Sequence, residues 1–171
     1  MMAFTPLVRA LAERKVRYLL IGVAGANFYA HAAGVVFTVE RRELLVPRDP
    51  ENLLHAWQSC ESAGLELVGS GEPLDRPRDL DLAERVVRRS ALTRALGAAD
   101  LQIDLTLVMA GFEFEAVWPA RTTFTFEGAE VPVARLRHIV ESKAAVGRHK
   151  DQLFLATHEE NLRQLLGPDK G

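Results

Sequence analysis

Acidic residues on two predicted strands are the side chains of this sequence best suited to chemistry. Residues 38–46 predict a strand that reaches Glu40 and Glu43. Residues 101–108 alternate between apolar and polar side chains and predict a second strand, which carries Asp104. Acids that share one face of neighbouring strands can clamp the metal ions that neutralise charge in nucleotidyl transfer. Glu43 and Asp104 are therefore candidate catalytic residues and candidate ligands of Mg²⁺, and Glu40 is a further catalytic candidate.

A glycine turn precedes the acidic strand. Residues 16–21 form a continuous apolar run, typical of a strand in a sheet covered on both faces, and Gly22 ends this run. The small residues of the segment 24–33 suit a helix packed close to that sheet. Because Gly22 has no side chain and opens a helix, a phosphate can approach its amide and the positive end of the helix.

Length and composition predict one ordinary globular domain. The chain has 171 residues, of which 48% are hydrophobic and 26% charged, and its net charge of -2 gives no general attraction to polyanions. Cys60, the single cysteine, cannot form an intramolecular disulfide, and its helical context predicts a buried, inert thiol. No apolar run is long enough to span a membrane and the start of the chain lacks a secretory signal, so we expect a cytoplasmic protein.

The order of predicted elements indicates an α/β (α+β) domain over residues 1–171, with a mixed sheet flanked by helices and a helical C-terminus. Besides the elements above, the pattern predicts a helix starting at Thr5-Pro6, a hairpin at 122–133 and an exposed loop at 69–78. The remaining predictions are strands at 35–46 and 65–68 and helices at 50–63, 81–96, 135–146 and 150–166.

Several segments, taken in this order, resemble the minimal nucleotidyltransferase fold, near the abortive-infection toxin type and related uncharacterised proteins. They are Tyr18-Leu19-Leu20-Ile21-Gly22, Thr38 with Leu44-Leu45-Val46, Ile103-Asp104-Leu105, and Glu141-Ser142-Lys143-Ala144-Ala145-Val146-Gly147-Arg148-His149-Lys150-Asp151. The resemblance implies Mg²⁺-dependent transfer of a nucleotide from a nucleoside triphosphate to a hydroxyl acceptor. It also implies a set of nucleotide-binding positions: Gly22, Val23, Thr38, Arg41, Lys143, Arg148 and Lys150.

The acidic strand departs from the family pattern at Arg41. If Leu44-Leu45-Val46 sets the register, the two positions of the expected Asp-x-Asp pair hold Arg41 and Glu43. A guanidinium cannot ligate a cation and repels one. A one-residue bulge would instead bring Glu40 into the first acid position. The simpler structural alternative is an exposed ion pair between Arg41 and Glu43.

Two functions therefore stay open from the sequence. The first is a Mg²⁺-dependent nucleotidyltransferase, and the second is a non-catalytic nucleotide-binding or protein-interaction module of toxin–antitoxin type. In the second, Arg41 neutralises phosphate or Glu43 in place of a metal, and a partner protein or a homodimer is expected. A nucleic-acid acceptor has little support from the acidic composition. The literal Asp79-Leu80-Asp81 motif is better explained as a helix cap, and Lys143, Arg148 and Lys150 could simply be a solvated helix face.

Overall fold

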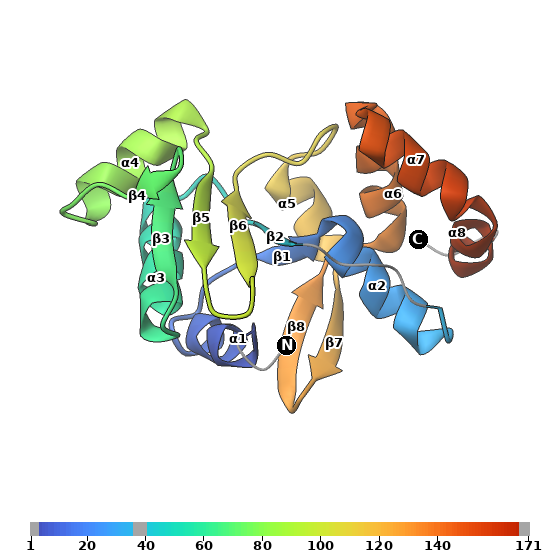
Figure 1. The fold of residues 1–171 in the computed structure, drawn as a ribbon, viewed down its shortest axis with the longest axis horizontal. Helices are drawn as coiled ribbons and strands as arrows, with labels where there is room; N and C mark the ends of the chain where they lie inside the picture. The colour runs from blue at the N-terminus through green and yellow to red at the C-terminus, as the bar shows by residue number, and fades with distance from the viewer. Residues whose placement is uncertain (1–3, 36–40, 168–171) are drawn as a thin grey trace.

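The computed structural model describes residues 4–35 and 41–167 and confirms the mixed α/β class. Figure 1 shows its helices and strands. The strands are β1 Leu19–Ile21, β2 Arg42–Leu45, β3 Glu66–Gly69, β4 Glu72–Pro73, β5 Thr93–Leu96, β6 Gln102–Thr106, β7 Thr122–Phe126 and β8 Ala129–Val133. The helices are α1 Phe4–Glu13, α2 Gly22–Ala32, α3 Pro50–Ser62, α4 Leu80–Arg89, α5 Phe114–Val117, α6 Leu136–Val146, α7 His149–Thr157 and α8 Glu159–Leu166, with a 3₁₀ turn at Trp118–Ala120.

All eight strands belong to one mixed sheet. Their order is β4-β3-β5-β6-β2-β1-β8-β7, and the pairs β2–β6 and β1–β8 are parallel while the other pairs are antiparallel. The antiparallel pair β1–β2 is connected through α2, which packs against both strands and against α6. This connection brings the glycine turn, the acidic strand and the C-terminal helices to one part of the molecule.

The helices cover the sheet in two groups (Figure 1). Helix α3 packs against α1, α4 and β3, while α6 packs against α2 and α7. The start of α3 follows its sequence signals, because the Asp49 carboxylate accepts hydrogen bonds from the amides of Glu51 and Asn52 and proline occupies the first turn. Trp57 of this helix is completely buried, and its indole donates to Thr93 Oγ1 at 3.1 Å. Burial of such a side chain contributes about 1.5–3 kcal/mol.

The prediction of a helix over residues 81–96 was wrong in its second half. Helix α4 ends at Arg89, because Ser90 adopts a left-handed conformation with φ 51° that breaks the helical hydrogen bonding. The chain then forms β5, whose side chains alternate between buried and more exposed positions. Strand β5 has only four residues, which are too few to show the alternation typical of a strand. The charged residues of α4 directly before it also favoured the prediction of a continuing helix. The correction matters because β5 pairs directly with β6, the strand of Asp104.

Three other boundaries differ from the predictions. The expected loop at 69–78 contains β4, which forms a hairpin with β3, and the expected helix at 150–166 is divided into α7 and α8 at His158. The strand predicted at 35–46 is observed as β2, Arg42–Leu45; Thr38 and Glu40 lie outside the described residues, as does the bulge proposed for Glu40. The hairpin at 122–133 and the helix ending at Val146 are confirmed.

Two smaller expectations are also confirmed. Cys60 is completely buried, and burial raises the pKa of its thiol to about 12, which leaves it protonated and unreactive. The Asp79 carboxylate caps α4 by accepting a hydrogen bond from the amide of Leu82 at 3.0 Å. No helix in the described part of the chain is long and apolar enough to cross a membrane.

Candidate functional site

The predicted acids Glu43 and Asp104 are neighbours in the sheet. Glu43 on β2 pairs with Asp104 on β6 on one side and with Ile21 on β1 on the other. Asp104 in turn pairs with Arg94 on β5. Directly paired residues project to the same face, so these four side chains form one row across the sheet. The expected juxtaposition of the two acids is therefore present.

Asp104 is buried and held by two arginines. Its side chain is only 5% exposed. Oδ1 accepts a hydrogen bond from Arg94 Nε at 2.8 Å and one from Gln102 Nε2 at 3.3 Å, while Oδ2 lies 3.6 Å from Arg41 Nε. Asp104 is thus neither a solvent-facing acid nor an acid directed at a second carboxylate. The ion pair imagined between Arg41 and Glu43 is replaced by one between Arg41 and Asp104.

Arg94 is the functional candidate that the sequence did not reveal. It lies in the segment predicted as helix, where its charge resembled those of the neighbouring arginines. Only the antiparallel pairing of β5 with β6 places it opposite Asp104. The spacing of Thr93 and Ala95 as inward-facing residues was the one local signal for this placement.

Glu43 lies against the glycine turn. Gly22 has φ 67°, and a Cβ atom built on it would collide with the Glu43 carboxylate. No hydrogen bond or ion pair joins Glu43 to another residue in the described ranges 4–35 and 41–167. The carboxylate of Glu43 therefore reaches the start of α2 only because residue 22 has no side chain.

Substitution of Gly22 by Ala tests this close approach. The left-handed conformation disfavours alanine by about 1–2 kcal/mol, and displacement of Glu43 adds to this cost. Gly64→Ala is the matched control, since Gly64 has φ 82° with nothing within 4 Å of an added Cβ. We expect urea denaturation to show a larger loss of stability for Gly22→Ala than for Gly64→Ala. Equal losses would contradict the contact with Glu43.

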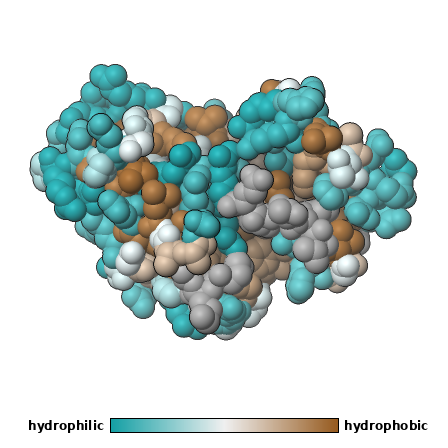
Figure 2. Space-filling model, viewed as in Figure 1, coloured by the Kyte–Doolittle hydropathy of each residue, from teal (hydrophilic) through white to brown (hydrophobic). Residues whose placement is uncertain are grey.

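A cleft lies beside this row of residues, between the sheet and helices α6 and α7. It consists of two adjoining cavities of about 260 Å³ and about 190 Å³ that share Glu43, Lys143, Arg148 and Asp151. In Figure 2 the surface is indented between the strand-rich lobe and the lobe of α6–α8, with hydrophilic residues along the indentation. We refer to the two cavities together as the cleft.

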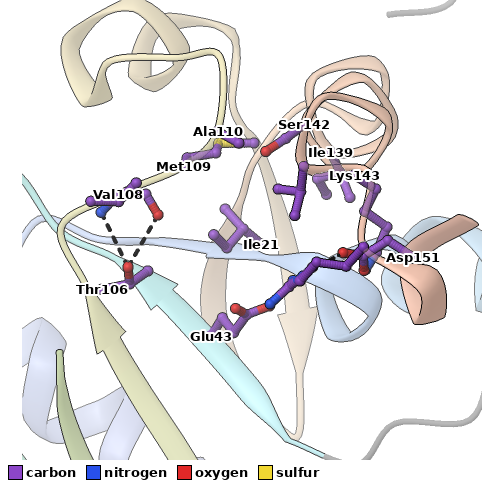
Figure 3. Close-up of a pocket in the computed structure, with 13 residues that line it drawn as sticks. Ile21, Glu43, Thr106, Val108, Met109, Ala110, Ile139, Ser142, Lys143 and Asp151 are labelled. Atoms are coloured by element: carbon purple, nitrogen blue, oxygen red, sulfur yellow. Dashed lines mark hydrogen bonds and ion pairs between the residues drawn. The ribbon is translucent and has the colours of Figure 1, made fainter.

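The residues that line only the larger cavity are mostly apolar, and we call this cavity the apolar end of the cleft. Figure 3 shows Val108, Met109 and Ala110 on one wall, Ile139 and Ser142 of α6 on the other, and Glu43 at the base. The Thr106 hydroxyl also lines this cavity and is held by the backbone of Val108, with both distances 3.1 Å. Val108 and Val146 are exposed at 53% and 40%. This end offers apolar side chains and two hydroxyl groups beside the four charged residues that it shares with the smaller cavity.

The smaller cavity is the basic end of the cleft. Besides the four shared residues, it is lined by Val23, Arg41, Lys150 and Phe154. The structure therefore brings together, around the cleft, all the predicted nucleotide-binding positions that it describes: Gly22, Val23, Arg41, Lys143, Arg148 and Lys150. Asp104 is not in the lining and reaches the cleft only through Arg41.

Asp151 fixes two of these cations. It is almost completely buried, and it accepts hydrogen bonds from Lys143 Nζ at 3.0 Å and from Arg148 Nε at 2.7 Å. Burial raises the pKa of the Asp151 carboxyl, but the hydrogen bonds from Arg148 and Lys143 outweigh it and leave the pKa below its ordinary value. Lys143 also lies over the ring of Phe154, 5.2 Å from its centroid.

The electrostatics of the cleft favour an anion. Four cationic side chains face the two carboxylates of Glu43 and Asp151. Helices α2 and α7 also start at the cleft, and neither has a side chain that caps its first amides. Unpaired amides and the positive end of the helix dipole attract phosphate or carboxylate groups.

The described residues do not by themselves fit the pair of Mg²⁺ ions that the family resemblance implies, and Glu40, the third predicted acid, lies outside the described ranges. Within the described ranges, no three His, Cys, Asp or Glu side chains cluster closely enough to hold a metal ion. Of the two predicted ligands, Glu43 is available, whereas Asp104 is engaged by two guanidinium groups that repel a cation.

Comparison with known proteins adds no relative: no family model matches the chain, and no curated protein matches it. The nucleotidyltransferase resemblance therefore stays a prediction from the residues.

Proposed function

We propose that this protein binds a nucleoside triphosphate in the cleft. The observation that carries the proposal is a cleft with apolar side chains and two hydroxyl groups toward one end and four cations at the other, two of which, Lys143 and Arg148, line both ends. A nucleotide is divided in a similar way, since its base is flat and largely apolar while its phosphates are anionic. Small-molecule sites commonly combine apolar walls with a few well-placed polar groups in this way.

Each end of the cleft has a defined role in this proposal. The base lies between Val108 and Ile139, with the hydroxyls of Thr106 and Ser142 within the same cavity. The phosphates lie toward Lys143, Arg148 and the first amides of α2. A lysine or arginine contact with phosphate is a charge-assisted hydrogen bond, roughly twice as strong as a neutral one.

Calorimetric titration with ATP tests the proposal, and Lys150→Ala is its cleanest variant. Lys150 is exposed, lines the basic end, and makes no hydrogen bond or ion pair with another residue that the structure describes. Its removal should therefore weaken ATP binding about ten-fold, equivalent to about 1.4 kcal/mol, without changing the melting temperature. Arg88→Ala, on the exposed face of α4, should change neither quantity. No saturable binding of ATP to the natural protein would refute the proposal.

Mg²⁺-dependent nucleotide transfer to a hydroxyl acceptor is the second candidate, favoured by the direct pairing of Glu43 with Asp104. Turnover of ATP in the natural protein would support it, whereas turnover gained only in Arg41→Asp would identify a degenerate site. A nucleotide-binding module without catalysis agrees better with the arginines around Asp104. Such a module could pair with a partner protein or a second copy in a toxin–antitoxin system. We propose the cytoplasm as its compartment, since nucleoside triphosphates are abundant there.

A further inference from the structure

We infer that Arg41, anchored by Asp104, takes the place of the divalent cation, so that the cleft binds the metal-free triphosphate. This inference rests on the proposed nucleotide site and specifies the form of the ligand. Arg94 is the positioning residue of the arrangement, because it holds Asp104 without lining the cleft.

Both carboxylate oxygens of Asp104 are already occupied by neighbouring side chains. Arg94 Nε and Gln102 Nε2 both donate to Oδ1, which fixes the carboxylate and leaves Oδ2 facing Arg41. The closer pair, at 2.8 Å, is with Arg94, and the pair with Arg41 is longer at 3.6 Å. Arg94 therefore compensates the charge of Asp104 most directly, and Arg41 keeps a positive charge that is only loosely paired.

Arg41 can reach a ligand in the cleft. Its side chain is 33% exposed and lines the basic end together with Lys143, Arg148 and Lys150. Arg41 approaches Asp104 through Nε, and its terminal Nη atoms make no hydrogen bond with another residue of the described ranges. A guanidinium presents parallel N–H groups that can bridge two phosphate oxygens, as a metal ion does in other sites.

The charge of the cleft favours the metal-free form of the ligand. Within the row of paired residues, Glu43 could share a cation only with Asp104, and Asp104 is flanked by Arg41 and Arg94. A Mg²⁺ ion placed between the two acids would therefore meet two positive charges. Free ATP carries two more negative charges than its magnesium complex and complements the excess of cations in the cleft better. Magnesium should therefore weaken ATP binding.

Titration calorimetry with ATP, in EDTA and then in excess MgCl₂, tests the inference. We expect the dissociation constant in EDTA to be lower than that in MgCl₂. Arg41→Gln should weaken binding in EDTA at least about ten-fold, and Arg88→Gln should leave it unchanged. In the double variant Arg41→Gln, Arg94→Gln, which frees Asp104, MgCl₂ should strengthen ATP binding relative to EDTA.

The results that would contradict this inference can be distinguished from those that would contradict the proposed function. Binding of ATP to the natural protein that is as tight in MgCl₂ as in EDTA, or tighter, would overturn the inference and leave the proposed nucleotide site standing. Binding in EDTA that is unaffected by Arg41→Gln would also overturn it. Absence of binding under both conditions would refute the proposed function, and this inference with it. The comparison of the two conditions needs only the natural protein, so it does not depend on any variant folding.

Discussion

Substitution of Asp151 by Asn is expected to lower the free energy of unfolding by about 3 kcal/mol, because breaking one side of a buried charge pair leaves the other charge uncompensated. Lys143, whose side chain is 11% exposed, would lose its partner in a position where water replaces it poorly. Arg148 is half exposed and would be solvated at less cost. Urea denaturation measures the difference. Asp81→Asn, which removes an exposed partner of Arg85, is the control and should cost less than about 1 kcal/mol.

The same carboxylate predicts the pH dependence of stability. The pKa of Asp151 is lower in the folded protein than its ordinary value of 3.8. Its contribution to stability is therefore complete above the ordinary value and is lost as the pH falls through the folded-state pKa. The stability difference between the natural protein and Asp151→Asn should be constant at neutral pH and shrink below about pH 4. A difference that grew on acidification would contradict the assignment.

Substitution of Lys143 by Met is expected to have the largest effect on nucleotide binding. Lys143 belongs to both cavities of the cleft, and methionine retains most of its apolar stem beside Phe154. A hydrogen bond to a charged group contributes about 1.5–3 kcal/mol, so ATP affinity should fall about 10- to 150-fold.

The comparison of Lys143→Met with Lys150→Ala separates position from charge. Both variants remove one positive charge, but only Lys143 is fixed by Asp151. Fluorescence or calorimetric titration should show the greater loss for Lys143→Met. Equal losses would mean that the cleft attracts ATP only by its overall charge, and unchanged affinity in both would place the nucleotide elsewhere.

The sequence predicted which residues lie together better than it predicted the boundaries of the elements around them. Gly22, Glu43 and Lys143 were singled out from a motif order, and the structure places them around one cleft. Their positions follow from local sequence patterns. One is an apolar strand ended by glycine, and the other is a C-terminal helix that ends at Gly147 with φ 67°. Such signals depend on neighbours in the chain, so they can be read from the residues alone.

The environment of Asp104 could not be read in the same way. Alternation on β6 correctly separated Asp104 from Ile103 and Leu105, but burial of the carboxylate depends on Arg94 and Arg41. These contacts arise from the pairing of β6 with β5 and β2, and strand pairing is set by the whole sheet. From the sequence, Arg41 was therefore interpreted as the loss of one acid from an expected pair. In the structure it is one of the two arginines that pair with Asp104.

A crystal structure of the protein grown with ATP tests the central claim most directly. We expect the triphosphate to lie against Arg41, Lys143 and Arg148, with the base between Val108 and Ile139 and Asp104 still paired with Arg94. ATP bound outside the cleft, or an Asp104 released from Arg94 to ligate a metal ion, would contradict it.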